Sequence, residues 1–160
     1  MTPAIDQLRA AGVAYSMHEY ERDETSGGGY GLEAAIKLGL DPDQVFKTLL
    51  VTYDDRAGRA TQAVAIVPVS GKLSLKAVGA ALGTKRVDMC DPQLAERITG
   101  YVVGGISPFG QRKRLATVLD ELALVFDTIY VSGGRRGLDL GVAPDDLVSL
   151  LGATVADIAG

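Results

Sequence analysis

The sequence is poor in the residue types from which metal and nucleophile sites are usually built. Among its 160 residues are one histidine, His18, one cysteine, Cys90, and no tryptophan. A zinc ion needs roughly three or four ligands, most often cysteine or histidine, so these two residues predict no metal site. We expect neither a metal nor another cofactor.

Export and membrane signals are also missing. The first ten residues, MTPAIDQLRA, lack the basic and apolar regions of a signal peptide, and the longest apolar runs are too short to span a bilayer. With 47% hydrophobic and 22% charged residues, the composition is that of a globular protein. We therefore expect residues 1–160 to form a single soluble domain in the cytoplasm.

Signatures of several large enzyme classes are absent as well. The chain has no G-x-S-x-G motif, no lysine-containing phosphate loop and no G-x-G-x-x-G motif that opens a long helix. These absences argue against serine hydrolases, kinases and dehydrogenases. Cys90 lies in RVDMCDP, where Asp88 and Asp91 disfavour a thiolate, so packing is the favoured role for this cysteine.

Positive charge is concentrated in the middle of a chain whose net charge is -4. Residues 72–114 carry eight Lys and Arg against three Asp and Glu, whereas both flanking segments are acidic. Such a block is usually a solvated face, and it is also the pattern of a small RNA-binding surface. Composition alone leaves both interpretations open.

Turn and cap residues divide the chain into short helices and strands. Thr2-Pro3 and Asp91-Pro92 predict helix starts, and DDRAGR predicts the turn of a β-hairpin. The predicted helices are 3–12, 32–39, 73–83, 91–100 and 144–152, and the predicted strands are 13–20, 45–53, 60–69, 86–90, 101–103, 115–120, 127–132 and 137–142. Because no long crossover helices alternate with the strands, we expect a mixed α/β (α+β) fold whose sheet is largely antiparallel or barrel-like, with short helices outside.

A lysine interrupts the apolar run QVFKTLLVTY, residues 44–53. On a strand, Lys47 shares a face with Val45, Leu49 and Val51. One explanation is an ordinary lysine near the start of the strand whose amine reaches water. The other is a cation held at the mouth of a pocket for an anionic or ester-bearing ligand.

Two glycine turns are further candidates for chemistry. In YVVGGISPFGQRKR, Gly104-Gly105 follows a predicted strand and lets the backbone approach a ligand with its N–H groups turned outward, although a plain turn is the simpler alternative. The same segment ends in Arg112, Lys113 and Arg114. The second turn, VSGGRRGLDLG, contains Ser132 and is followed by Asp139, for which a solvent-facing position is an open alternative.

Three of these segments, QVFKTLLV, YVVGGISPFGQRKR and IYVSGGRRGLDL, closely resemble the YbaK/EbsC family of aminoacyl-tRNA deacylases, in the family's order and spacing. The resemblance runs from MTPAIDQL to ATVADIAG. That family is similar to the editing insertion domain of bacterial prolyl-tRNA synthetase. The resemblance implies a mixed α/β fold with a curved central sheet surrounded by helices.

The resemblance also assigns roles to individual residues. It implies that Lys47 is the essential lysine of the family's KT motif and that Thr48 lies beside it in the substrate pocket. By the same resemblance, Tyr20 and Tyr30 are pocket aromatics, Gly104-Gly105 faces the aminoacyl ester, and Ser132 and Asp139 form a polar wall. Tyr30 departs from the family, where a phenylalanine is expected, and its loop TSGGGYGLE is unusually rich in glycine.

The implied activity is release of a mischarged amino acid from tRNA, most closely cysteine from Cys-tRNA(Pro). In cysteine-specific members the thiol of the substrate is expected to attack its own carbonyl and form a thiolactone. Gly104-Gly105 amides would then stabilise the oxyanion, while Lys47 would hold the terminal ribose or phosphate. Arg112, Lys113 and Arg114 would guide the acceptor end of tRNA, and prolyl-tRNA synthetase is a candidate partner.

Three other functions remain open from the sequence. The first is hydrolysis of Ala-tRNA(Pro) by water. The second is a non-catalytic accessory protein that binds tRNA or a synthetase through the basic loop. The third is a ligand-binding domain that does not use RNA.

Overall fold

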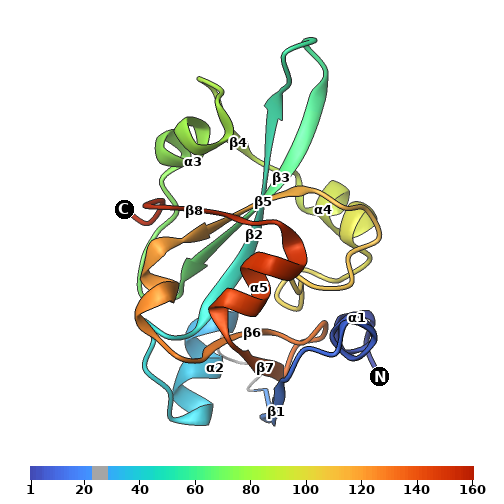
Figure 1. Cartoon of the computed structure of the whole chain (residues 1–160), viewed down its shortest axis with the longest axis vertical. Coiled ribbons are helices and arrows are strands. Elements are labelled where there is room, and N and C mark those ends of the chain that lie inside the picture. The colour runs from blue at the N-terminus through green and yellow to red at the C-terminus, as the bar shows by residue number, and fades with distance from the viewer. Residues whose placement is uncertain (23–28) are drawn as a thin grey trace.

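The computed structural model describes residues 1–22 and 29–160, which form two β-sheets surrounded by short helices (Figure 1). The expected mixed α/β class and the predominance of antiparallel pairing are confirmed, and the sheets do not close into a barrel. Residues 23–28 of the predicted glycine-rich loop lie outside the described residues.

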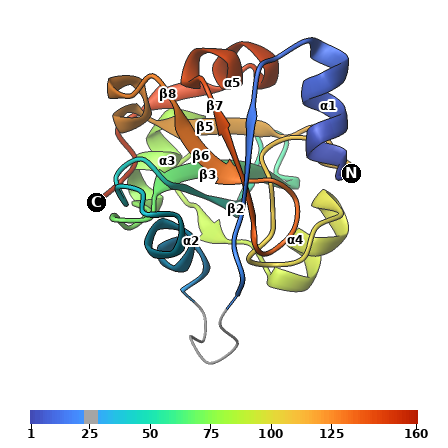
Figure 2. The ribbon, with the colours of Figure 1, turned by 90° about the horizontal axis from the view of Figure 1, so that it is seen from below.

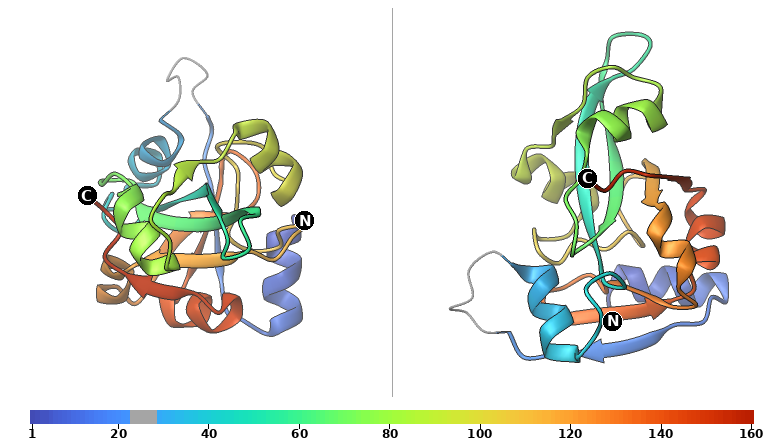
Figure 3. Two further views of the ribbon diagram at one scale, coloured as in Figure 1. Left: turned by 90° about the horizontal axis from the view of Figure 1, so that it is seen from above. Right: turned by 90° about the vertical axis from the view of Figure 1, so that its left-hand side faces the viewer.

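The larger sheet has the strand order β4-β2-β3-β5-β8. Its strands are β2 (Phe46–Asp54), β3 (Ala60–Pro68), β4 (Asp88–Met89), β5 (Ala116–Asp120) and β8 (Thr154–Ala156). The predicted hairpin is confirmed as the antiparallel pair β2–β3, whose tip projects beyond the rest of the molecule (Figure 3). The Oδ1 atom of Asp55 closes its turn by accepting hydrogen bonds from the N–H groups of Ala57 and Arg59, both at 2.9 Å.

The smaller sheet is antiparallel and has the order β1-β7-β6. Its strands are β1 (Ser16–Glu19), β6 (Ile129–Ser132) and β7 (Leu138–Val142). Asp139 on the central strand lies opposite His18 on one side and Ser132 on the other. The two sheets meet where Tyr130 N–H donates to the carbonyl of Gln44, just before β2.

Five α-helices and one 3-10 helix surround the sheets in the part of the chain that the structure describes. They are α1 (Pro3–Ala11), α2 (Tyr30–Leu38), α3 (Leu75–Leu82), α4 (Pro92–Thr99), α5 (Pro144–Leu151) and the 3-10 helix η2 (Glu121–Val125). The predicted caps are confirmed, since Thr2 accepts from Ile5 N–H and Asp91 from Leu94 N–H. None of these helices is long and apolar enough to cross a membrane.

Apolar packing on both faces of the β2–β3 hairpin explains the nearly continuous hydrophobic run in β2. Phe46 and Leu50 belong to the core that includes residues of α1, α4 and α5, whereas Val51 and Val67 pack with residues of α3. Figure 1 accordingly shows α3 and α4 on opposite sides of the hairpin. The smaller sheet is likewise covered by α2 on one side and α5 on the other (Figure 2).

The predicted strand at residues 101–103 is wrong, and a turn takes its place. Gly105 N–H donates to the carbonyl of Val102 at 2.9 Å, and Gly104 has a φ of +87°, which favours glycine. Tyr101 is buried because it anchors the turn, with its hydroxyl donating to the carbonyl of Phe109 at 2.6 Å. Of the three residues only Tyr101 is buried, whereas Val102 and Val103 are 51% and 37% exposed, so the apolar triplet does not mark a buried strand.

Candidate functional site

A cavity of about 330 Å³ lies between β2, the smaller sheet, the start of α2, α4 and the turn before Ile106. Seven of the predicted site residues line it: Tyr20, Tyr30, Lys47, Thr48, Gly104, Ser132 and Asp139. Gly105, Arg112, Lys113 and Arg114 are not among its lining residues. The structure thus gathers most of the predicted pocket and leaves the predicted tRNA-binding residues elsewhere.

The sheet registers bring these residues together from distant parts of the chain. Ser132 and Asp139 are directly opposite each other on β6 and β7, so their side chains share one face of the smaller sheet. Lys47 and Thr48 come from the start of β2, which meets that sheet at Tyr130. The polar wall of the cavity therefore depends on the contact between the two sheets.

Thr48 carries a buried hydroxyl without a hydrogen-bond partner among the described residues. The residue is 9% exposed, and its Oγ1 atom is buried and unpaired. Leaving such a group unsatisfied costs roughly 1–3 kcal/mol. Because Thr48 lines the cavity, a bound ligand is the natural partner for its hydroxyl.

Asp139 is a second polar group that the fold leaves unsatisfied. It is 6% exposed and accepts no hydrogen bond from any residue in 1–22 or 29–160, so a solvent-facing position for this side chain is wrong. Burial raises its pKa to about 7. Burial, and after it the charge of Asp139, raises the pKa of Tyr20. A cation in the cavity would favour the ionised carboxylate.

Lys47 lines the same cavity and is half-buried. Burial, followed by repulsion from Lys72, lowers its pKa. Lys47 forms no ion pair or hydrogen bond within the described part of the chain. Its location supports the pocket interpretation over that of an ordinary lysine whose amine only reaches water.

The two glycines of the first turn have different environments. Gly105 N–H donates to the carbonyl of Val102, and Val103 N–H donates to Glu96 Oε2 at 2.8 Å. Gly104 N–H makes no hydrogen bond to a described residue, so it is the donor of this turn that a ligand could use. The predicted direct role of Gly105 loses its structural basis because its N–H group is already bonded.

Gly105 instead lets the two glycine turns pack against each other. A Cβ atom at Gly105 would lie 2.9 Å from the backbone nitrogen of Arg136 and 3.0 Å from the Cα and carbonyl carbon atoms of Arg135. In the second turn, Ser132 Oγ accepts from Gly134 N–H at 3.2 Å and keeps its own hydrogen for another acceptor. Ser132 thus remains a possible donor to a ligand.

No side chain of the cavity has the environment of an activated nucleophile. Cys90 lines the cavity, but burial, and then the charge of Asp91, raises the pKa of its thiol, which lies 3.5 Å from the Asp91 carbonyl. His18 is hydrogen-bonded to Ser16 at 2.8 Å, packs edge-on against Tyr130, and does not line the cavity. No group of three His, Cys, Asp or Glu suited to a metal exists in residues 1–22 and 29–160.

The predicted basic residues border a different hollow. Lys113 and Arg114 line a depression of about 310 Å³ that includes Asp6 and Gln7 of α1. The side chain of Arg112 packs close to Gly100. These residues lie on a surface separate from the lining of the main cavity.

Sequence reasoning missed two arginines that contact Tyr30, a residue of the cavity lining. The guanidinium carbons of Arg22 and Arg136 lie 4.3 Å and 4.7 Å from the ring centroid of Tyr30. The sequence SGGRRG signals positive charge in the second turn, but no local pattern distinguishes Arg136 from Arg135. Only the packing of the two turns shows which arginine reaches Tyr30.

Comparison with known proteins places this geometry in a family. Residues 31–150 match the family model of the aminoacyl-tRNA editing domain. A curated relative from Enterococcus faecalis (strain ATCC 700802 / V583), provisionally named Cys-tRNA(Pro)/Cys-tRNA(Cys) deacylase EbsC, is 38% identical over 124 residues, which are 78% of this chain and 73% of the relative.

Solved structures show the same fold along nearly the whole chain. The crystal structure of the hypothetical protein APE2540 is 26% identical, has a TM-score of 0.84, and is matched over 99% of both chains. A crystal structure provisionally named a trans-editing enzyme for prolyl tRNA synthetase is 22% identical with a TM-score of 0.77, over 100% of this chain and 99% of that one. The resemblance carried by the three motifs is thus confirmed, and the chain belongs to the aminoacyl-tRNA editing domain family.

Proposed function

We propose that this chain is a trans-editing deacylase that releases a mischarged amino acid from aminoacyl-tRNA, most closely cysteine from Cys-tRNA(Pro). The observation that carries the proposal is a small cavity, in an editing domain, in which the Thr48 hydroxyl and the Asp139 carboxyl have no hydrogen-bond partner among the described residues. The name of the Enterococcus relative supports cysteine as the amino acid.

The polar wall suits the amino group of an aminoacyl ester. At neutral pH this group is an ammonium ion in much of the substrate, and it would pair with the carboxylate of Asp139. Thr48 and Ser132 supply hydroxyls that can bond the ammonium or the ester oxygens. Substrate binding would therefore satisfy groups that the empty fold leaves unpaired.

Much of the remaining lining of the cavity is apolar and suits a small side chain. Its lining includes Phe46, Leu50, Met89, Cys90 and Ala95. A volume of about 330 Å³ is at the small end of ligand pockets, which matches an amino acid better than a whole nucleotide. The ribose and the rest of the tRNA would then extend out of the cavity mouth.

The chemistry needs no nucleophile from the protein. The substrate thiol would attack its own carbonyl carbon: a carbon–sulfur bond forms, the ester carbon–oxygen bond breaks, and the thiol proton ends on the ribose oxygen. The products are a thiolactone and deacylated tRNA. Gly104 N–H would stabilise the developing oxyanion, and Lys47 would stabilise the departing ribose oxygen.

The proposal also covers the domain organisation, the compartment and the partners of the chain. We place residues 1–160 in one editing domain that works in the cytoplasm, where tRNA is charged. Arg112, Lys113 and Arg114, on their separate surface, would contact the acceptor arm of tRNA and not the ester. Prolyl-tRNA synthetase is the partner that would supply mischarged tRNA(Pro).

The direct test is a deacylation assay on a panel of Cys-, Ala- and Pro-charged tRNA(Pro). We expect wild-type protein to release cysteine fastest and Lys47→Ala to slow that release by about 100-fold, the effect of losing one charge-stabilising group. Lys76→Ala is the matched control, because Lys76 is an exposed lysine that does not line the cavity.

Each other outcome of this assay has a definite meaning. Preferred release of alanine would assign the chain to water-dependent hydrolysis of Ala-tRNA(Pro). Binding of tRNA without release of any amino acid would overturn the deacylase proposal and favour an accessory protein. Equal rates for wild-type protein and Lys47→Ala would remove Lys47 from the mechanism.

A further inference from the structure

Two arginines from distant parts of the chain converge on one aromatic ring at the cavity mouth. Arg22 follows β1, Arg136 lies in the turn between β6 and β7, and both guanidinium groups lie over the ring of Tyr30. Tyr30 is the first residue of α2 and lines the cavity. Cations over a ring are attracted to it, but two cations at one ring also repel each other.

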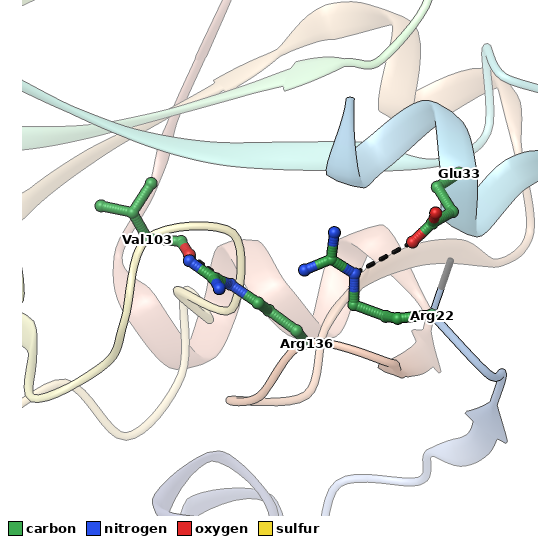
Figure 4. Close-up of polar contacts among 4 residues, drawn as sticks. All are labelled: Arg22, Glu33, Val103 and Arg136. Carbon is green, nitrogen blue, oxygen red and sulfur yellow. Dashed lines mark hydrogen bonds and ion pairs between the residues drawn. The ribbon is translucent and has the colours of Figure 1, made fainter. Parts of the chain in front are cut away.

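Each guanidinium is held in place by a hydrogen bond from its Nε atom (Figure 4). Arg22 Nε donates to Glu33 Oε1 at 3.0 Å, and Arg136 Nε donates to the carbonyl oxygen of Val103 at 2.8 Å. These contacts fix the direction of both side chains. For Arg136 they leave the two terminal amino groups without a hydrogen bond to the described residues.

Among residues 1–22 and 29–160, no acid pairs with Arg136. Arg22 pairs with Glu33, and Arg135 pairs with Glu19 at 3.2 Å. Arg136 has no ion pair among the residues that the structure describes, and its anchor is the neutral carbonyl of Val103. A guanidinium that is fixed in direction and has two unused parallel N–H donors can bind a phosphate group through bidentate hydrogen bonds.

The position of this pair matches the path of a nucleotide that leaves the cavity. Val103 and Tyr30 both line the cavity, so the group anchored on Val103 lies at its rim. An aminoacyl ester bound inside would direct its ribose toward that rim. The 5′-phosphate of the same nucleotide is the nearest anion that the substrate carries.

We propose that Arg136, assisted by Arg22, binds the 5′-phosphate of the terminal nucleotide of the aminoacyl-tRNA. The inference rests on the proposed function, because it takes the ester end of tRNA as the ligand. The phosphate would relieve the repulsion between the two guanidinium groups, and Tyr30 would hold both of them in position.

The test compares two minimal substrates, each with cysteine esterified to a ribose hydroxyl of adenosine. One is cysteinyl-adenosine, and the other, cysteinyl-adenosine 5′-monophosphate, carries in addition a free 5′-phosphate. Arg136→Gln should lower kcat/KM for the phosphorylated ester by about 10- to 100-fold, the effect of losing hydrogen bonds to a charged group. It should leave the phosphate-free ester within about twofold of wild type. Arg135→Gln is the matched control and should change neither rate, since Arg135 is exposed and pairs with Glu19.

Two results would overturn the inference. An equal loss on both esters would mean that Arg136 only positions Tyr30, and no loss on either would mean that it has no part in binding. Arg136→Lys keeps the charge but cannot form bidentate hydrogen bonds. It should give an intermediate loss of kcat/KM on the phosphorylated ester alone.

A binding measurement on wild-type protein separates this inference from the proposed function. Calorimetry with AMP and with adenosine should show AMP binding about tenfold or more tightly, a difference that disappears in Arg136→Gln. Equal binding of the two by wild-type protein would overturn the phosphate site even if deacylation is observed. Tighter binding of AMP without deacylation would support the site and overturn the enzyme assignment.

Discussion

Two aspartates are almost equally buried in this chain, yet the fold treats them in opposite ways. Asp120, at the end of β5, is 3% exposed and accepts hydrogen bonds from the N–H groups of Leu122, Ile158 and Ala159, at 3.2, 2.9 and 3.1 Å. Asp139, in the cavity, accepts none from the described residues. Asp120 fastens the C-terminal segment to η2, whereas Asp139 is kept at a cost to stability.

Two buried threonines repeat the contrast. Thr99 in α4 is 1% exposed, donates to the carbonyl of Ala95 at 2.8 Å and accepts from Tyr101 N–H at 3.2 Å. The Thr48 hydroxyl has no such partner among residues 1–22 and 29–160. Unsatisfied polar groups thus occur where a ligand would supply the missing bonds, which distinguishes a binding site from a packed core.

The largest effect on stability is expected at the satisfied aspartate. Asp120→Ala leaves three backbone donors without their acceptor and should lower the free energy of unfolding by roughly 3–5 kcal/mol. Urea titration monitored by circular dichroism measures this change. A loss below about 1 kcal/mol would break the contrast between the two aspartates.

Asp139→Asn should instead increase the free energy of unfolding, by an amount that depends on pH. The pKa of this carboxyl is about 7 in the folded chain and near its ordinary value of 3.8 when unfolded, so folding favours the protonated form. The resulting penalty is absent below pH 4, grows between pH 4 and 7, and is complete above pH 7. Relative to its difference at pH 4, the variant should therefore be more stable than wild type by roughly 4 kcal/mol above pH 7.

The same substitution should impair catalysis while it improves stability. In wild-type protein, kcat/KM should fall as the pH drops below about 7, because Asp139 becomes protonated and loses its attraction for the substrate ammonium. Asp139→Asn should lower kcat/KM at neutral pH and remove this acidic limb. A variant with full activity and an unchanged profile would contradict the assigned role.

The two threonines allow a smaller and cleaner comparison. Thr99→Val should destabilise the fold by roughly 1–2 kcal/mol without altering catalysis, since it removes a satisfied hydroxyl outside the cavity. Thr48→Val should leave stability unchanged or slightly higher and raise KM by about tenfold through one lost hydrogen bond to substrate. The reverse pattern would show that the Thr48 hydroxyl has a structural role.

The smallest effect is expected on the separate basic surface. Replacing Arg112, Lys113 and Arg114 together by glutamine should raise KM for full-length aminoacyl-tRNA by about two- to fivefold and weaken its dependence on salt. The rate on cysteinyl-adenosine should not change, because these residues do not line the cavity. An equal loss on both substrates would connect this surface to the ester site.

Local chemistry in the sequence was enough to predict much of the frame. The hairpin of β2 and β3 follows from its turn, and the ends of α1 and α4 follow from Thr2, Asp91 and the closing glycines. Residues 101–103 were predicted wrongly because an apolar triplet also occurs in a turn, here one that buries Tyr101 and exposes Val102 and Val103. Nor did the sequence distinguish one sheet from two, since pairing between distant strands has no local signature.

The site, like the fold, was predicted in part from the sequence and depends in part on contacts between distant segments. The resemblance to a family supplied Lys47, Thr48, Ser132 and Asp139, but it contained no sign that the hydroxyl of Thr48 is unpaired. Gly105 was assigned to the ester, whereas its N–H group closes the turn. The positions of these groups depend on contacts between the two sheets and between the two glycine turns, which only the folded chain reveals.

In the proposed reaction the substrate, and no side chain of the protein, provides the nucleophile. Single-turnover release from Cys-tRNA(Pro) and from Ser-tRNA(Pro) tests this assignment of the nucleophile with wild-type protein and Cys90→Ala, which removes the one thiol of the chain. We predict that Cys90→Ala releases cysteine within about threefold of the wild-type rate, and that serine leaves about 100-fold more slowly than cysteine because it lacks the intramolecular thiol. Loss of activity in Cys90→Ala together with an acyl adduct on Cys90 in wild-type protein, or equal release of serine and cysteine, would contradict the account.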